Sequence, residues 1–381
     1  MKANYTKLAV LSLGHIINDW YMNYIPVLLP FLILAGIDVS RAAFLISAFT
    51  ITSSLSQPCF GYLVDQKNQR WLVYVGTIWM AVLLGLLGVV NSYPVMLSLS
   101  ILAGFGTAAF HPQASAMASG IDLQKKGMYL SIFVAGGNLG WALTPLLLVP
   151  FIETYGLSST PWIILPGIVA AVILWTSSPK VEKKAFQAPV IPLRTILKQS
   201  GRELLKIITI VTFRSLAYFG LIAFLPLYLH ERNISLISGG RLLFFMLIGG
   251  AIGGIIGGTL SDHFGRKKII IVSLLASSPL FFIFLNNVTS LFGYTVLILA
   301  GIMLLSSFSV TIVSAQELIR KNAAMASGLI LGFGQGVGGL GVGIIGLLSK
   351  SFGLPVAIHT LIWLPLIAGL LGFTLKKPSS Q

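Results

Sequence analysis

Charged side chains are scarce in this chain of 381 residues, because Asp, Glu, Lys and Arg together make up only 9% of it. Soluble domains carry about 25% of these residues, so this chain has too few to cover a globule of its length. Its 56% hydrophobic content excludes an intrinsically disordered protein. Cys59 is the single cysteine, which excludes an intrachain disulfide scaffold. The composition therefore indicates a protein that crosses a membrane many times.

Long apolar runs fill most of the sequence, and each approaches the roughly 20 residues that a helix needs to span a bilayer. Twelve runs lie at about 8–35, 42–64, 71–90, 95–118, 127–152, 160–177, 206–229, 240–261, 268–286, 290–315, 323–349 and 354–375. They are continuous rather than alternating with a period of two, which favours helices over the strands of a barrel. The first run is too long for the apolar core of a cleaved signal peptide. The predicted fold class is an all-α membrane protein with twelve transmembrane helices.

The segments between the runs alternate in charge. Of the 25 Lys and Arg residues, 20 fall on the side of the N-terminus, 4 fall on the opposite side, and Arg214 lies within a run. Because basic residues concentrate in cytoplasmic loops, we expect a bacterial inner (plasma) membrane protein with both termini in the cytoplasm. The same bias explains the net charge of +15 without a nucleic-acid partner.

Proline and basic residues concentrate in the middle of the chain, between 178 and 206, with six runs on either side. We therefore expect a six-helix bundle at 1–178, a cytoplasmic basic linker at 179–205 and a second six-helix bundle at 206–381. Five aliphatic residues of the linker fall at near-helical spacing: Leu193, Ile196, Leu197, Leu204 and Leu205. This segment is either a helix lying on the membrane surface or a solvated linker.

The two halves repeat each other at a nearly constant offset. The sequence GYLVD at 61–65 matches GTLSD at 258–262, an offset of 197, and Pro30 pairs with Pro226 at an offset of 196. A constant offset between two sets of six runs predicts duplicated, pseudo-symmetric bundles.

The second copy of this repeat continues as GTLSDHFGRKK and resembles the loop signature of the major facilitator superfamily. The residues that carry the likeness are Gly258, Asp262, Gly265 and Arg266, and the first copy keeps Gly61 and Asp65. We expect these residues to form a gating loop in which glycine allows close helix packing and the aspartate caps a helix or meets the arginine.

Further motifs resemble the fosmidomycin-resistance family of bacterial efflux proteins over nearly the whole chain. They are HIIND at 15–19, QP at 57–58, FHP at 110–112, GGNLG at 136–140, AQEL at 315–318 and a glycine-rich run that includes 338–341. Gln113 and Arg214 depart from the family pattern, which more often has an acidic residue and a lysine there. The resemblance implies proton-driven efflux by alternating access.

Ionisable residues inside a membrane span are costly and therefore are functional candidates. Asp19 lies roughly 16 Å into the first run, and His15 and Asn18 share its helical face. Arg214 in the seventh run is nearly equivalent to Asp19 in the repeat. An Asp19–Arg214 pair would be either a lock between the halves or a purely structural ion pair.

Four other polar positions complete the substrate-binding and coupling candidates. His111 shares a face with Thr107 in the fourth run and either titrates during transport or donates a packing hydrogen bond. Asn138 and Tyr218 either contact substrate or bond neighbouring helices. Glu317 is a gate, a coupling carboxylate or a solvated helix end.

No nucleotide, metal or nucleophile motif accompanies these residues. The GQGVGG stretch at 334–339 lies inside an apolar run rather than after a strand, so it does not indicate a dinucleotide site. We expect no cofactor, no metal and no enzymatic activity. The predicted function is proton-coupled efflux (antiport) of a small, anionic metabolite or drug, with uptake symport of an organic anion as the alternative. The expected partners are substrate, protons and the lipid bilayer, and we expect a monomer to function.

Overall fold

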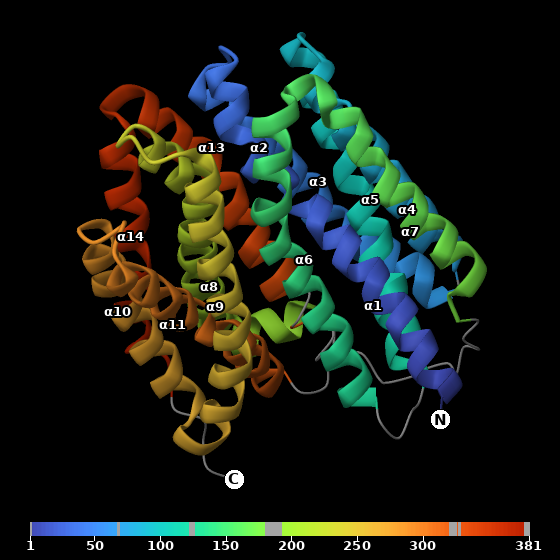
Figure 1. Ribbon diagram of the computed structural model, residues 1–381. Helices are drawn as coiled ribbons and strands as arrows, with labels where there is room; N and C mark the ends of the chain where they lie inside the picture. Colours follow the sequence, from blue (N-terminus) through green and yellow to red (C-terminus); the bar gives the residue numbers. More distant parts are fainter. Residues whose placement is uncertain are drawn as a thin grey trace. The chain divides into compact units, whose positions relative to one another are not determined.

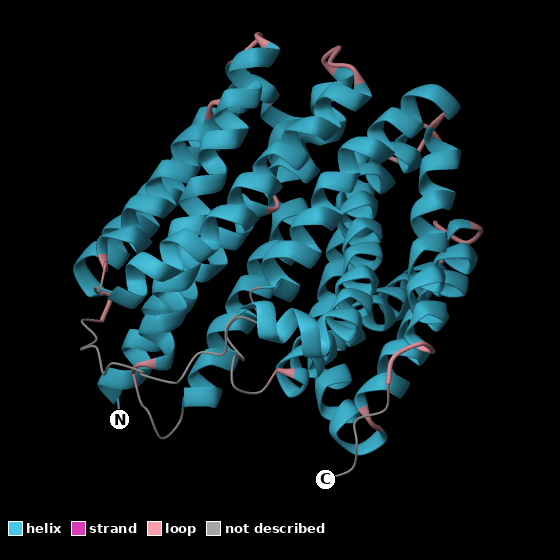
Figure 2. Ribbon diagram, turned by 180° about the vertical axis from the view of Figure 1, so that it is seen from behind, coloured by secondary structure: helices cyan, strands magenta, loops and turns pink. Residues whose placement is uncertain are grey.

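The computed structural model describes residues 2–66, 69–121, 126–179, 193–319, 326 and 329–376. Regular structure in these described residues is helical throughout (Figure 2), which confirms the predicted all-α class. Contacts divide the chain into two compact units. The first comprises Met1–Ala185 with Leu229–Phe244, and the second comprises Phe186–Tyr228 with Phe245–Gln381.

The first unit contains the helices that run from blue to green along the chain (Figure 1). In chain order they are α1 (Lys2–Met22), α2 (Tyr24–Leu34), α3 (Val39–Gln66), α4 (Trp71–Gly85), the short 3-10 helix η1 (Leu87–Val89), α5 (Tyr93–Ser119), α6 (Lys126–Tyr155), η2 (Leu157–Ile163) and α7 (Ile164–Ser177). The predicted runs thus correspond to helices with boundaries shifted by a few residues.

The first membrane segment is two helices rather than one, because α1 ends at Met22 and α2 begins at Tyr24. Pro26 has no N–H and cannot donate to the carbonyl of Met22, so the helical ladder is interrupted there. Among the described residues, eleven helices are individually long and apolar enough to cross a membrane, and this split segment is the additional one expected from the sequence.

The core of the first unit is formed by five of its helices, including α1. Buried side chains from α1, α4, α5, α6 and α7 meet in one cluster that includes Leu11, Val73, Phe110, Phe133 and Leu174. Glycines bring α6 onto α1, because a Cβ at Gly140 would lie 2.2 Å from the backbone oxygen of Ile16. Close packing here fixes the polar face of α1 against α5 and α6.

The second unit contains most of α8 and the helices that follow the start of α9 (Figure 1). The helices are α8 (Leu193–His230), α9 (Leu236–Phe264), α10 (Arg266–Leu285), α11 (Leu291–Leu318), the π-helix η4 (Leu329–Gly334), α13 (Gln335–Phe352) and α14 (Leu354–Gly372). Because α8 already begins at Leu193, the second part of the predicted linker is the start of a long helix.

Small residues allow α9 and α11 to pack backbone against backbone. A Cβ at Gly253 would lie 2.2 Å from the carbonyl oxygen of Ile302, and one at Gly257 would lie 2.0 Å from that of Ser306. The glycine spacing in the sequence predicts such close packing. Gly258, the first residue of the loop motif, therefore lies next to α11.

Candidate functional site

A buried carboxylate lies between two histidines in the first unit. His15 and Asp19 are one turn apart on α1, and His15 Nε2 is 3.3 Å from Asp19 Oδ2. His111 comes from α5, and its Nε2 is 3.0 Å from Asp19 Oδ1. The helical spacing of His15 and Asp19 was readable from the sequence, whereas the approach of His111 depends on how α5 packs against α1.

The second ring nitrogen of each histidine is bonded to a backbone carbonyl. His15 Nδ1 is 2.7 Å from the oxygen of Phe133, and His111 Nδ1 is 2.9 Å from the oxygen of Thr107. The His15 ring also stacks on the Phe133 ring, with centroids 4.0 Å apart. Because a carbonyl oxygen only accepts, each Nδ1 carries a hydrogen and each Nε2 is directed at Asp19.

Gly137 on α6 makes room for this cluster. A Cβ added there would lie 2.5 Å from Asp19 Oδ2 and 2.6 Å from His15 Nε2. Sequence reasoning singled out the neighbouring Asn138 but missed Gly137, whose importance follows only from the packing of α6 on α1. Asn138 itself is exposed and takes no part in the contacts of the cluster that the structure describes.

An outer layer of polar contacts surrounds the cluster. The hydroxyl of Thr107 lies 3.0 Å from Asn18 Oδ1 and 3.0 Å from His111 Nδ1. Asn18 is fully buried, and its Nδ2 has no hydrogen-bond partner among the described residues. Asn18 therefore retains an unused donor next to a charged group, which is rare for a buried amide.

The three groups are close enough together that they could also hold a metal ion. One ligand atom from each of His15, Asp19 and His111 lies within 4.8 Å of the others. The pattern escaped sequence reasoning because the third member lies 92 residues beyond Asp19, far outside any linear metal motif.

Arg214 is the buried cation of the second unit. Its side chain on α8 is 1% exposed, and its Nη1 is 3.4 Å from the hydroxyl of Thr311 on α11. The guanidinium carbon lies 5.1 Å from the centroid of the Phe308 ring. Its Nε has no hydrogen-bond partner among the described residues. Tyr218 follows one turn later on α8, and its ring lies 5.5 Å from that of Phe219.

The carboxylates of the second unit are engaged elsewhere. The unit contains three, Glu203, Asp262 and Glu317. Glu203 pairs with Lys206, while Asp262 and Glu317 both pair with Arg266. Within its own unit Arg214 therefore lacks a carboxylate partner among the described residues. The Asp19–Arg214 pair concerns residues of different units and stays a prediction.

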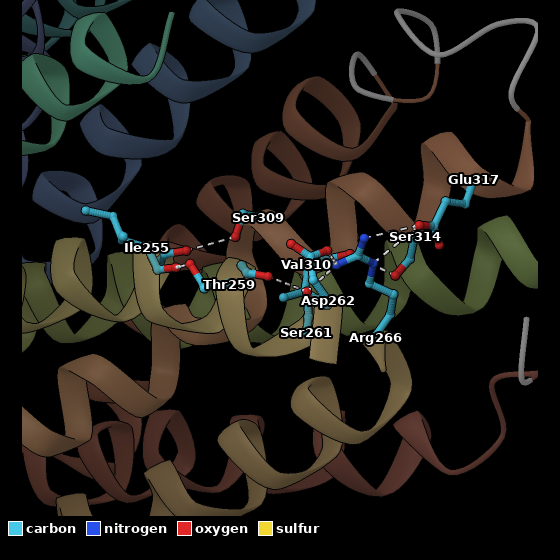
Figure 3. A network of polar contacts seen from close by, with 11 residues as sticks. Ile255, Thr259, Ser261, Asp262, Arg266, Ser309, Val310, Ser314 and Glu317 are labelled. Atoms are coloured by element: carbon cyan, nitrogen blue, oxygen red, sulfur yellow. Dashed lines mark hydrogen bonds and ion pairs between the residues drawn. The ribbon is translucent and has the colours of Figure 1, made fainter. Parts of the chain in front are cut away.

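The loop motif of the second unit is closed by Arg266 (Figure 3). Its Nη1 bonds Asp262 and the hydroxyl of Ser261 at the end of α9, and its Nη2 lies 3.3 Å from Glu317 Oε1 at the end of α11. Gly265 separates α9 from α10 with φ +88°, a backbone conformation that favours glycine. Glu317 thus contacts the loop motif through Arg266, and its role as gate, coupling carboxylate or solvated helix end stays a prediction.

The first copy of the motif is only partly described. Gly61 lies on α3, where an added Cβ would come no nearer than 4.0 Å to Pro112. The side chain of Asp65 lies outside the described part of the structure. The role predicted for Asp65 therefore stays a prediction.

Known proteins similar to this chain share one architecture. The signature of the Major Facilitator Superfamily matches residues 11–342. The chain is 31% identical to the fosmidomycin resistance protein of Escherichia coli (strain K12), over 94% of this chain and 90% of that protein. It is 32% identical to the uncharacterized MFS-type transporter YfnC of Bacillus subtilis (strain 168), over 99% and 94% of the two chains.

A solved structure of the nucleoside transporter NupG has the same fold. It matches with a TM-score of 0.80 over 98% of this chain and 100% of that one. The two sequences are only 13% identical, so the likeness concerns the fold alone. Helix architecture, loop motif and sequence similarity agree: this chain is a multi-pass membrane transporter that belongs to the Major Facilitator Superfamily.

Proposed function

We propose that the protein exports a small anion in exchange for protons by alternating access. The single observation that carries the anionic substrate is Arg214, a buried guanidinium whose unit offers it no free carboxylate. A buried charge without a partner is strongly unfavourable. An anionic substrate that reaches Arg214 would supply the missing charge.

The coupling step is assigned to the cluster around Asp19. A carboxylate in contact with two imidazoles offers three groups that exchange protons readily. Asp19 and His15 are buried on α1, where a lone charge would be costly. Proton arrival and departure at Asp19 would change the charge of this interior and thereby bias the exchange between outward-open and inward-open states.

The direction of export is supported by similarity to the fosmidomycin resistance protein. The excess of basic residues on one side supports a bacterial inner membrane location with both termini in the cytoplasm. The protein would act as a monomer, with substrate, protons and lipid as its partners.

Transport by purified protein in proteoliposomes tests this function. Under an imposed pH gradient we would measure fluxes of phosphonates, carboxylates and uncharged drugs for the native chain, Arg214→Ala and Arg214→Lys. We expect proton-coupled movement of an anion that fails in Arg214→Ala and is partly retained in Arg214→Lys. Arg241→Ala, which removes an exposed cation on α9, is the matched control.

Two results would contradict the proposal. One is transport of only uncharged or cationic compounds with equal rates in the native chain and Arg214→Ala. The other is anion flux in the direction of proton movement, which would identify an uptake symporter instead.

A further inference from the structure

The orientation of the two histidines directs both Nε2 atoms at Asp19. Both Nδ1 atoms are directed at backbone carbonyls, so in the neutral ring each Nε2 bears a lone pair and no hydrogen. Those lone pairs face the Asp19 oxygens at 3.0 and 3.3 Å. Three such groups at these short distances are held together by a positive charge, which is either a proton on an imidazole or a metal ion in its place.

The distances from the histidine nitrogens to the carboxylate are near the ligand spacing of a zinc site. Zinc binds histidine nitrogen at about 2.0–2.1 Å and carboxylate oxygen at about 2.0–2.2 Å in tetrahedral geometry. These bond lengths place neighbouring ligand atoms roughly 3.3 Å apart. His111 Nε2 is 3.0 Å from Asp19 Oδ1 and His15 Nε2 is 3.3 Å from Asp19 Oδ2, so each contact is near this value although the two involve different carboxylate oxygens. One ligand atom from each of the three residues lies within 4.8 Å of the other two.

The surroundings resemble the outer layer of known zinc sites. Histidine ligands usually donate their other ring N–H to a carbonyl or carboxylate, which fixes the ring and raises its basicity. Phe133 and Thr107 supply such carbonyls. The His15 ring is further held by stacking on Phe133. Both rings are thus already in the orientation that metal binding needs.

One side of the cluster is open. The side chain of His111 is 21% exposed, compared with 6% for His15 and 10% for Asp19. Gly137 contributes no Cβ where it faces Asp19 and His15. A metal ion could therefore enter past His111 and keep a fourth position for water.

We propose that His15, Asp19 and His111 form a binding site for one divalent transition-metal ion, with zinc as the best fit. Zinc suits a set of two imidazoles and one carboxylate. Binding releases protons from its ligands, so zinc occupies the cluster in place of protons. Zinc binding itself does not depend on the proposed function. The further consequence, that bound zinc blocks proton-coupled flux, does rest on the proposed function.

Titration calorimetry of the tag-free, chelator-stripped protein with zinc alone tests the site. We expect one ion per chain, with the affinity lowered at least tenfold in His15→Ala and in His111→Ala. The same loss is expected for Gly137→Ala, which removes no ligand but places a Cβ against the cluster. His359→Ala, which removes an exposed histidine of α14, is the matched control and should bind as the native chain does.

Cobalt absorption provides a second readout that does not depend on transport. A tetrahedral site without sulfur ligands gives visible bands without thiolate charge transfer, and these bands should vanish in His111→Ala. Each variant is first checked for a single peak in size-exclusion chromatography. Absence of saturable binding, or equal affinity in the native chain and both histidine variants, overturns the site. Proton-coupled anion flux in the presence of a chelator remains a separate measurement, so failure of the metal site and failure of the proposed function are distinguishable.

Discussion

His111 on α5 lies 3.0 Å from Asp19 on α1, so the buried carboxylate is shared between two helices. The hydroxyl of Thr107, one turn before His111, reaches Asn18 on the same α1 helix. Two adjacent polar links therefore join α5 to α1. A change of charge at Asp19 therefore alters the contacts that both α1 and α5 make.

Replacing Asp19 by Asn should abolish proton-coupled flux while leaving membrane insertion intact. The amide keeps the shape of the carboxylate but removes the charge that both histidines face. Flux in proteoliposomes under a pH gradient measures the effect, and substrate exchange without a gradient serves as the control for correct folding. Native rates of gradient-driven flux in Asp19→Asn would remove this residue from the coupling mechanism.

Gly137→Ala should impair transport without changing any ionisable group. The new Cβ would come 2.5 Å from Asp19 Oδ2, so the carboxylate or α6 has to shift. We expect at least a tenfold loss of coupled flux, because a displacement of about 1 Å at a reacting group can cost two orders of magnitude. Gly254→Ala, whose Cβ would meet nothing nearer than 4.0 Å, should transport normally. Normal flux in Gly137→Ala would show that the cluster tolerates displacement.

Gly257→Ala should destabilise the second unit. Its Cβ would lie 2.0 Å from the carbonyl oxygen of Ser306, which is backbone and cannot rotate away. Overpacking of this kind costs about 1–3 kcal/mol. Thermal unfolding in detergent, followed by size-exclusion chromatography, should show a lower midpoint for Gly257→Ala than for Gly254→Ala. Equal midpoints would contradict the close packing of α9 on α11.

Arg266→Ala should slow transport more than it lowers stability. Arg266 connects the start of α10 to Glu317 at the end of α11, in addition to Asp262. These carboxylates are exposed enough that each pair contributes less than about 1 kcal/mol. A double-mutant cycle of Arg266→Ala with Glu317→Gln on transport rate should be non-additive, since both changes break one link. Additive effects would mean that the pair is incidental.

Cysteine labelling can test the proposed orientation, because Cys59 is the only native cysteine. In a Cys59→Ser background, Asn91→Cys should react with an impermeant maleimide added outside intact cells. Asn4→Cys, in the N-terminal helix, should react only after the cells are opened. The reverse labelling pattern would place the termini outside and contradict the rule that basic loops stay in the cytoplasm.

Helical periodicity was sufficient to predict local relationships. It placed His15 with Asp19 and Thr107 with His111, since each pair is separated by one turn. Apolar run length was likewise sufficient for the helices and the all-α class. The loop signature offered two roles for its aspartate, capping a helix or meeting the arginine, and Asp262 contacts Arg266, four residues away.

Contacts between different helices could not be predicted from the sequence. Nothing in linear spacing places His111 on Asp19, or Gly137 against both. The pairing of Glu317 with Arg266 across 51 residues is of the same kind. Such contacts depend on which faces of the helices meet, and periodicity specifies a face without specifying its neighbour.

The interruption between α1 and α2 divides the first membrane segment into two helices. α1 carries Asp19, and at the interruption the amide of Asn23 donates to the carbonyl of Trp141 on α6 at 3.0 Å. Beyond it, Pro26 leaves the Met22 carbonyl without its helical donor. The missing hydrogen bond makes this the point at which the first membrane segment bends most easily. Asp19 and its histidines lie on one side of that point, and the buried apolar residues of α2 lie on the other.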